Sequence, residues 1–364
     1  MSDNLKRYLA IKKGLLQLYP KPPSGHLEQG LKTLAMFING IVASKSTHTR
    51  EVAKKTRTGA KVNSREMQLS RWYKNPAVTY ETYMLPYVEQ VLAGISGQTL
   101  TIIIDGSEVG RGCMALMLTA VYQRRAIPLL WSVVKGSKGH LSTATHLELL
   151  QRLHDLLPEG VDVVLLGDGE FDSVELQAFV EQQAWHYVCR TAKNSQVCEY
   201  AVWQALDEIT LWPGCRLSLP NVQFTQQAYG PVLVILWWRK GEKEPIYLVT
   251  NFDLTVEACD FYAKRMRIET FFADQKSRGF HLHKSHISDP TRLSRLLIAA
   301  CLAYIWVIAL GVLTVKRKLV GVIHRTHRCD LSLFQLGLDL LEHLLNEEEP
   351  IPFSFALRFV PRKP

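Results

Sequence analysis

Four polar side chains suited to phosphate and metal chemistry stand close together near the middle of the C-terminal half. Tyr262, Arg265, Glu269 and Lys276 are separated by 3, 4 and 7 positions. On one helix beginning near Val256, a rotation of about 100° per residue would place all four within an arc of roughly 60°. The carboxylate could hold a divalent metal, and the hydroxyl and cations could hold phosphate oxygens. The alternative is an ordinary solvated helix face with a weak Arg265–Glu269 pair.

Two aspartates upstream follow strongly apolar runs. The runs are TLTIIIDGS, which stops at Asp105, and VDVVLLGDGEFDS, which stops at Asp168. Ligands gather at the carboxyl ends of neighbouring strands in an open α/β sheet, so we expect both carboxylates at one site. An Asp-Gly turn is the alternative for either residue alone. Glu170 and Asp172 are rival metal ligands, although Asp172 is predicted to cap the helix that follows.

The surrounding patterns predict the elements that would position these acids. Strands are predicted for CMALMLTAVYQ, AIPLLWSVV and WHYVCRT, and helices for THLELLQRLHDLL and SVELQAFVEQQ. Together with the two acidic runs, this β-β-β-α-β-α-β order outlines an α/β fold of the ribonuclease-H-like class. Three strand-like runs interrupt the outline, namely NVQFTQQAYG, PVLVILWWRKG and PIYLVTNF.

The spacing of the four polar residues matches a known signature. Tyr262, Arg265, Glu269 and Lys276 resemble the Y-R-E-K motif of DDE-type transposases of bacterial insertion sequences, specifically the insertion-sequence-four-like family. The stretch RMRIETFFADQKSRGFHLHKSHI resembles that family over its whole length, and the resemblance runs from about residue 98 to 312. One position departs from it, because Gly169 stands where many members carry Arg after the second Asp.

The resemblance implies a retroviral-integrase-like core with Asp105, Asp168 and Glu269 as catalytic residues. These acids would bind two Mg²⁺ ions, for which Mn²⁺ can substitute, with Asp105 bridging both ions. The other three signature residues would contact DNA beside the scissile phosphate. The family's β-rich insertion can also carry an aromatic that stacks on a flipped base, and Trp237 and Trp238 are the candidates. The alternative for each Trp is a strand-core or surface aromatic.

The chain is expected to contain five regions. They are a helical basic DNA-binding region (1–97), the first part of the core (98–192), a β-rich insertion (193–256), the second part of the core (257–315) and a C-terminal helical tail (316–364). Residues 1–80 hold 15 Lys and Arg against 4 Asp and Glu, in a chain whose net charge is +9. This imbalance suits DNA, although a merely soluble basic surface is the alternative. Arg65, Arg71 and Lys74 would lie on the later helix of a helix-turn-helix variant.

Several other features limit the classes of protein to which the chain can belong. Seven cysteines without a C-x-x-C pair argue against a disulfide scaffold and fit a reducing cytosol. The N-terminus has no apolar core of the signal-peptide type. Residues 296–315 are uncharged and could span a bilayer, but a buried core helix is favoured. His281, His283 and His286 could bind zinc, but a basic DNA-facing loop is favoured.

The predicted function is cut-and-paste DNA transposition. The protein would hydrolyse a phosphodiester at each transposon end, and the freed 3′-hydroxyl would attack target DNA. The partners would be double-stranded DNA, as terminal inverted repeats and as target, and a second copy in a synaptic homodimer, with no membrane. The resemblance also implies a hairpin intermediate and a location in the bacterial cytosol, associated with the nucleoid. The alternatives are a catalytically inactive DNA-binding protein derived from a transposase and a structure-selective ribonuclease-H-like nuclease.

Overall fold

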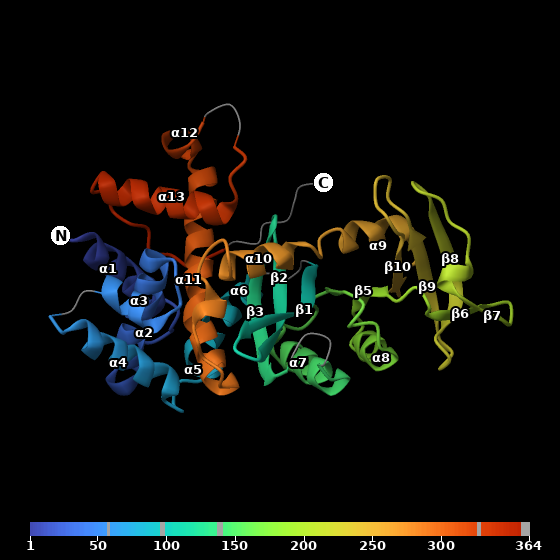
Figure 1. Cartoon of the computed structure of the whole chain (residues 1–364), viewed down its shortest axis with the longest axis horizontal. Coiled ribbons are helices and arrows are strands. Elements are labelled where there is room, and N and C mark those ends of the chain that lie inside the picture. Colours follow the sequence, from blue (N-terminus) through green and yellow to red (C-terminus); the bar gives the residue numbers. More distant parts are fainter. Residues whose placement is uncertain (57–58, 95–98, 137–140, 326–328, 358–364) are drawn as a thin grey trace.

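The centre of the molecule is one mixed β-sheet (Figure 1). The computed structural model describes residues 1–56, 59–94, 99–136, 141–325 and 329–357. In these residues ten strands follow the order β3-β2-β1-β4-β5-β10-β9-β8-β6-β7. The first half of the sheet consists of β1 (Leu100–Gly110), β2 (Cys113–Tyr122), β3 (Arg125–Lys135), β4 (Val163–Gly167) and β5 (His186–Thr191). The second half consists of β6 (Gln196–Glu199), β7 (Val202–Ala205), β8 (Arg216–Phe224), β9 (Tyr229–Trp237) and β10 (Ile246–Thr250).

The first half of the sheet confirms the predicted α/β class. β1, β2 and β3 are antiparallel neighbours, whereas β4 and β5 run parallel to β1. Parallel neighbours need crossover connections, and these are the helices α7 (Thr143–Leu156) and α8 (Val174–Gln182). Figure 1 places α7 and α8 along one side of the strands, and α9 (Thr255–Tyr262) and α10 (Arg267–Gln275) along the other. Because both faces are covered, β1 and β4 are almost wholly buried and read as apolar runs.

The start of α8 differs from the sequence prediction. Ser173 is the N-cap residue, and its hydroxyl accepts a hydrogen bond from the Leu176 amide at 3.3 Å. Asp172 accepts a hydrogen bond from Thr191 Oγ1 at 2.6 Å instead. The predicted cap at Asp172 is therefore wrong, because the adjacent hydroxyl takes that position and frees the carboxylate to link α8 to β5.

Residues 193–256 extend the same sheet. β10 pairs antiparallel with β5, and β9, β8, β6 and β7 follow outward. The sequence predicted β8, β9 and β10 but missed β6 and β7, which are four residues each and too short for a clear alternating pattern. The pairing of β10 also covers the edge of β5, which would otherwise present unpaired backbone groups.

The helix α11 (Pro290–Lys316) lies between the N-terminal helices and the sheet (Figure 1). It is long and apolar enough to cross a membrane, but 94% of its most apolar window is buried inside the protein. It contacts α2, α4 and α13 on one side and β3 and α10 on the other. Because other elements pack against α11 on all sides, its side chains are apolar around the whole helix, as expected for a core helix.

Most of the remaining helices lie around α11, whereas the short turn η1 lies between β7 and β8. The N-terminal ones are α1 (Asp3–Leu16), α2 (Gly25–Ser44), α3 (Thr49–Lys55), α4 (Val62–Lys74), α5 (Tyr80–Tyr83) and α6 (Leu85–Ala93). The others are α12 (Val320–Ile323), α13 (Leu333–Asn346) and the short 3₁₀ turns η1 (Leu206–Glu208) and η2 (Leu282–Lys284). Glycine allows α13 to approach α11 closely. A Cβ added to Gly337 would lie only 1.9 Å from the Val307 carbonyl oxygen, so any larger residue would clash there.

Candidate active site

Two of the predicted catalytic acids come from neighbouring strands that pair in parallel: Asp105 lies in β1, and Asp168 directly follows β4. The register pairs Ile103 of β1 with Leu166 of β4, so each aspartate stands two residues beyond a paired position. Asp168 directly follows β4, as predicted. β1 continues to Gly110 because β2 pairs with it beyond the end of β4, so the prediction that Asp105 ends its strand is wrong.

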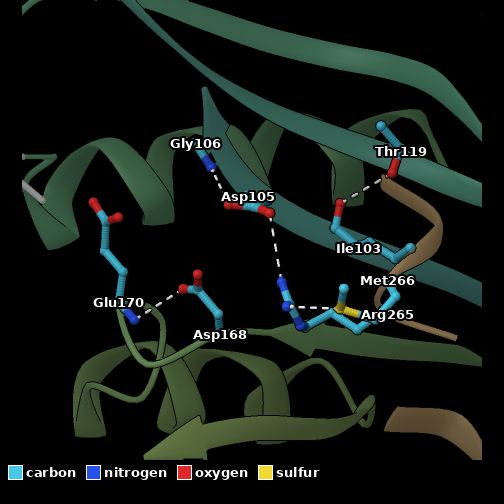
Figure 2. Close-up of polar contacts among 8 residues, drawn as sticks. All are labelled: Ile103, Asp105, Gly106, Thr119, Asp168, Glu170, Arg265 and Met266. Carbon is cyan, nitrogen blue, oxygen red and sulfur yellow. Dashed lines mark hydrogen bonds and ion pairs between the residues drawn. The ribbon is translucent and has the colours of Figure 1, made fainter. Parts of the chain in front are cut away.

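Backbone amides orient both carboxylates. Asp105 Oδ1 accepts a hydrogen bond from the Gly106 amide at 2.8 Å, and Asp168 Oδ1 accepts one from the Glu170 amide at 3.0 Å (Figure 2). Asp105 is buried and Asp168 is half-buried. Fixing one oxygen of a carboxylate holds the side chain in a defined direction, as is typical of groups that bind metals or activate substrates.

Arg265 reaches Asp105 from the segment between α9 and α10 (Figure 2). Its Nη1 lies 3.5 Å from Asp105 Oδ2, and the two side chains are 12% and 2% exposed. The guanidinium compensates a carboxylate that would be costly to bury alone. Arg265 Nε is also buried and has no hydrogen-bond partner in the described residues. A phosphate oxygen could satisfy that donor.

The four signature residues do not lie on a single helix. Tyr262 ends α9, Arg265 lies in the connection, Glu269 lies in the first turn of α10, and Lys276 follows it. The connection consists of tight turns, in which the Arg265 amide donates to the Tyr262 carbonyl at 2.9 Å. Such i→i+3 turns advance by a different angle than an α-helix, so the predicted single face is wrong. Tyr262 is buried, which raises the pKa of its phenol.

Glu269 and Lys276 face the part of β1 just beyond Asp105. Lys276 Nζ donates a hydrogen bond to Ser107 Oγ at 2.6 Å. Glu269 is exposed and lines a cavity of about 420 Å³ with Gly106, Ser107 and Lys276. α10 therefore presents its carboxylate to the strand that carries Asp105. Ser107 was not identified from the sequence, although its place two residues after Asp105 puts it on the same face of the strand.

The three acids do not form a closed cluster. Asp168 and Arg265 line one cavity, Glu269 lines a second, and Arg265 contacts Asp105. Across the described ranges, no group of three His, Cys, Asp or Glu side chains is arranged to hold a metal ion. His281, His283 and His286 are included in that statement, so the zinc site that the sequence left open does not appear there. By donor type the three acids suit Mg²⁺, which prefers carboxylate oxygens.

The cavity at Asp168 has a volume of about 650 Å³. It opens between the two halves of the sheet, and its charged and aromatic lining side chains are those of Asp168, Arg190, Lys193, Asp207, Trp238, Glu244, Tyr247 and Arg265. This volume is in the usual range for small-molecule sites. The lining holds three cations and two aromatic rings, which can contact a phosphate and a planar base, and three carboxylates, which can hold a cation between them and that phosphate.

The same cavity separates the two Trp candidates. Trp238 lines it, and its indole donates to the Glu242 carbonyl at 3.0 Å. Trp237 ends β9, and the guanidinium of Arg239 stacks on its ring at 4.3 Å from the centroid. Only Trp238 of this pair is therefore placed beside Asp168.

Arg190 and Lys193 were missed by the sequence analysis. Arg190 is exposed near the end of β5, which pairs in parallel with β4. The rule that ligands collect at the carboxyl ends of parallel strands applies to β5 as much as to β4. The signal was therefore present in the run WHYVCRT, whose Arg stands at the strand end.

The basic residues predicted to bind DNA in the N-terminal region all lie on α4. Arg71 and Lys74 are exposed. Arg65 is half-buried, and its guanidinium donates to the Thr56 carbonyl. Arg65 therefore joins α4 to the end of α3, whereas the other two side chains extend into solvent.

Comparison with known proteins adds to this geometry. The family model described as "Transposase DDE domain" matches residues 97–306. A cryo-EM structure of a piggyBac transposase synaptic complex with hairpin DNA is similar over 96% of this chain and 82% of that chain, with 11% sequence identity and a TM-score of 0.48. No curated protein sequence shows a significant match.

Proposed function

The chain belongs to the transposase DDE domain family, and on that premise we propose that it catalyses cut-and-paste DNA transposition. The observation that carries the proposal is that Asp105 and Asp168 each lie two residues beyond a paired position of neighbouring parallel strands, with Arg265 against Asp105. Two carboxylates and a partly unpaired guanidinium suit a phosphodiester whose charge must be neutralised during cleavage. The resemblance of the Y-R-E-K residues further favours the insertion-sequence-four-like branch.

The proposed roles follow from position. Asp105, Asp168 and Glu269 would hold two Mg²⁺ ions, with Mn²⁺ as a possible replacement. When bound, such ions activate the attacking oxygen and stabilise the leaving oxygen. Arg265 and Lys276, which both contact β1, would direct their charges to oxygens of the phosphate backbone. Those contacts fix the register of the DNA but do not read its sequence.

The cavity beside Asp168 would receive an unstacked nucleotide at the transposon end. Trp238 supplies an aromatic face, and Arg190 and Lys193 supply charge for its phosphate. Stacking of one base on an aromatic side chain contributes about 1–3 kcal/mol, which offsets part of the cost of leaving the duplex. We assign this role to Trp238 rather than Trp237, because Trp238 lines the cavity.

The proposed substrates are the terminal inverted repeats of the element and a target duplex. Two copies would pair the two ends as a homodimer, and a hairpin would form on the transposon end. Arg71 and Lys74 would bind DNA from the N-terminal helices. The reaction would take place in the bacterial cytosol, at the nucleoid.

The test is incubation of the purified protein with a duplex carrying one end of its own element and Mg²⁺. Nicked, hairpin and joined products are resolved by electrophoresis. Asp105→Asn, Asp168→Asn and Glu269→Gln should each slow cleavage by at least about 100-fold, since changes in residues that only support metal ligands already cost 10–100-fold. DNA binding should survive. Glu170→Gln is the matched control and should cleave normally.

The products separate the alternatives. Binding without cleavage in the wild type would indicate a catalytically inactive relative. Nicks without joined products would indicate a nuclease. Full activity of any one of the three acid variants would remove that residue from the site, and loss of activity in Glu170→Gln alone would move the second ligand to Glu170.

A further inference from the structure

Between α10 and α11, the loop up to residue 288 is basic and contains no acid. From residue 275 to residue 288 it includes two lysines, one arginine and three histidines, and the first acid after it is Asp289. Asp289 caps α11, where its carboxylate accepts a hydrogen bond from the Arg292 amide at 2.8 Å. The loop therefore presents cationic and hydrogen-bonding groups without an acid to offset them.

Two other segments hold this loop in place. The Thr47 amide, just before α3, donates to the Phe280 carbonyl at 2.8 Å. The Arg111 amide, at the turn after β1, donates to the Ile287 carbonyl at 3.2 Å. Because backbone contacts fix it on both sides, side chains on the loop need little further ordering to bind a ligand.

The side chains of the three segments meet at one surface. Arg111 Nη2 lies 3.0 Å from His286 Nδ1, and the rings of His48 and His286 are 5.3 Å apart. Arg has no acceptor, so His286 accepts at Nδ1 and, when neutral, carries its proton on Nε2. That N–H is then available to an external acceptor. We call His48, Arg111, His283, Lys284 and His286 the histidine–arginine patch; all but the half-buried His48 are exposed.

The patch adjoins the active site on the Glu269 side. The loop begins at Lys276, which bonds Ser107, and the patch lies where β1 turns after Gly110. From Asp105 to Arg111, a rise of about 3.3 Å per residue gives roughly 20 Å at most. One DNA strand advances about 3.4 Å per nucleotide, so this span equals about six nucleotides. The nearby acid Glu108 lines the Glu269 cavity and is not part of the patch.

We propose that the histidine–arginine patch binds the phosphate backbone of the transposon-end duplex, up to about six nucleotides from the scissile phosphate. The inference rests on the proposed function and adds the path that the bound duplex takes across the protein. The terminal nucleotide enters the cavity with Trp238, and the body of the duplex leaves over the loop toward the N-terminal helices. The partner is DNA because the patch combines two cations, Arg111 and Lys284, with neutral donors that suit phosphate oxygens.

The experiment compares two pairs of charge-removing substitutions. Arg111→Gln with Lys284→Gln removes two charges from the patch. The matched control, Lys316→Gln with Arg317→Gln, removes two exposed charges at the far end of α11. The probe is a duplex carrying one end of the element, and Kd is measured through a salt titration. Each lost phosphate contact should lower the salt slope by about 0.9 and weaken binding by up to about 8-fold near 0.1 M salt. The control should match the wild type.

A second measurement uses the wild type alone. Phosphate ethylation should interfere with binding at positions within about six nucleotides of the cleavage site on the duplex side. A patch variant with wild-type Kd and salt slope, or interference confined to other positions, overturns the inference while wild-type cleavage leaves the proposed function standing. A wild type that neither binds nor cuts end DNA overturns both.

Discussion

Removal of the Asp274 carboxylate should destabilise the helix that carries Glu269. Arg125 Nη1 and Asp274 Oδ2 are 2.7 Å apart, with side chains 8% and 7% exposed, and they join the start of β3 to α10. Asp274→Ala leaves the Arg125 charge buried without its partner. Breaking a buried pair in this way typically costs 3–5 kcal/mol, so we expect a loss of about 4 kcal/mol in the free energy of unfolding.

The assay is urea denaturation at pH 7.5, together with Mg²⁺-dependent cleavage of end DNA. Asp260→Ala on α9 is the control, because Asp260 is exposed and its removal should change stability by no more than about 0.5 kcal/mol. Cleavage by Asp274→Ala should fall even where the protein remains folded, since α10 positions Glu269. A loss of stability below about 1 kcal/mol would refute the argument that this pair is fully desolvated.

The same residue should contribute a pH dependence. Burial raises the pKa of Asp274 to about 6, although the charge of Arg125 opposes the rise. A folded-state pKa above the unfolded value of 3.8 means that the folded protein binds the proton more tightly. This contribution to stability is fully present below pH 3.8 and is lost as the pH rises through about 6. Asp274→Ala should remove this component from a pH series of denaturation curves.

Three further predictions follow from buried or lining side chains. Gly337→Ala should lower the thermal midpoint, because the new Cβ would meet the Val307 carbonyl oxygen at 1.9 Å, and overpacking costs about 1–3 kcal/mol; an unchanged midpoint would show that α13 shifts freely. Burial lowers the pKa of His146, whose ring nitrogens have no hydrogen-bond partner in the described residues. The unfolded chain then binds the proton first, so stability should fall as the pH drops below about 6.5, and His146→Leu should reduce that fall in calorimetry. Trp238→Ala should weaken binding of the unstacked nucleotide at the transposon end by about 1–3 kcal/mol, whereas Trp237→Ala should not. Equal effects of the two substitutions on end DNA in a gel assay would contradict the assignment.

The local patterns were sufficient for most of the elements of the first half of the sheet, although not for β6 and β7 further along the chain. Alternating and continuous apolar runs predicted β1, β4 and α7, because burial of a strand or helix face leaves a periodic mark in the sequence. Asp105 and Asp168 stood out because each interrupts such a run. The long apolar helix α11 could be interpreted in two ways from composition, and its burial in the protein favours the core helix.

The sequence predictions were wrong where the local helix or strand pattern competes with tertiary contacts. The segment from Tyr262 to Lys276 carries helical spacing throughout, yet it breaks into α9 and α10 where Arg265 turns toward Asp105. Asp105 lies inside β1 because β2 extends the strand beyond β4. Neither outcome depends on the residues next to the site in the chain.

By itself, the sequence determined the strands and helices of the first half of the sheet, the acids available for chemistry and the basic character of the N-terminal region, since each is a property of nearby residues. The tertiary structure decided which groups meet. It brought Arg125 to Asp274, Trp238 rather than Trp237 to the Asp168 cavity, and Arg111 to His286. The energy of such contacts depends on distance and burial in three dimensions, and no periodic pattern in the chain records them.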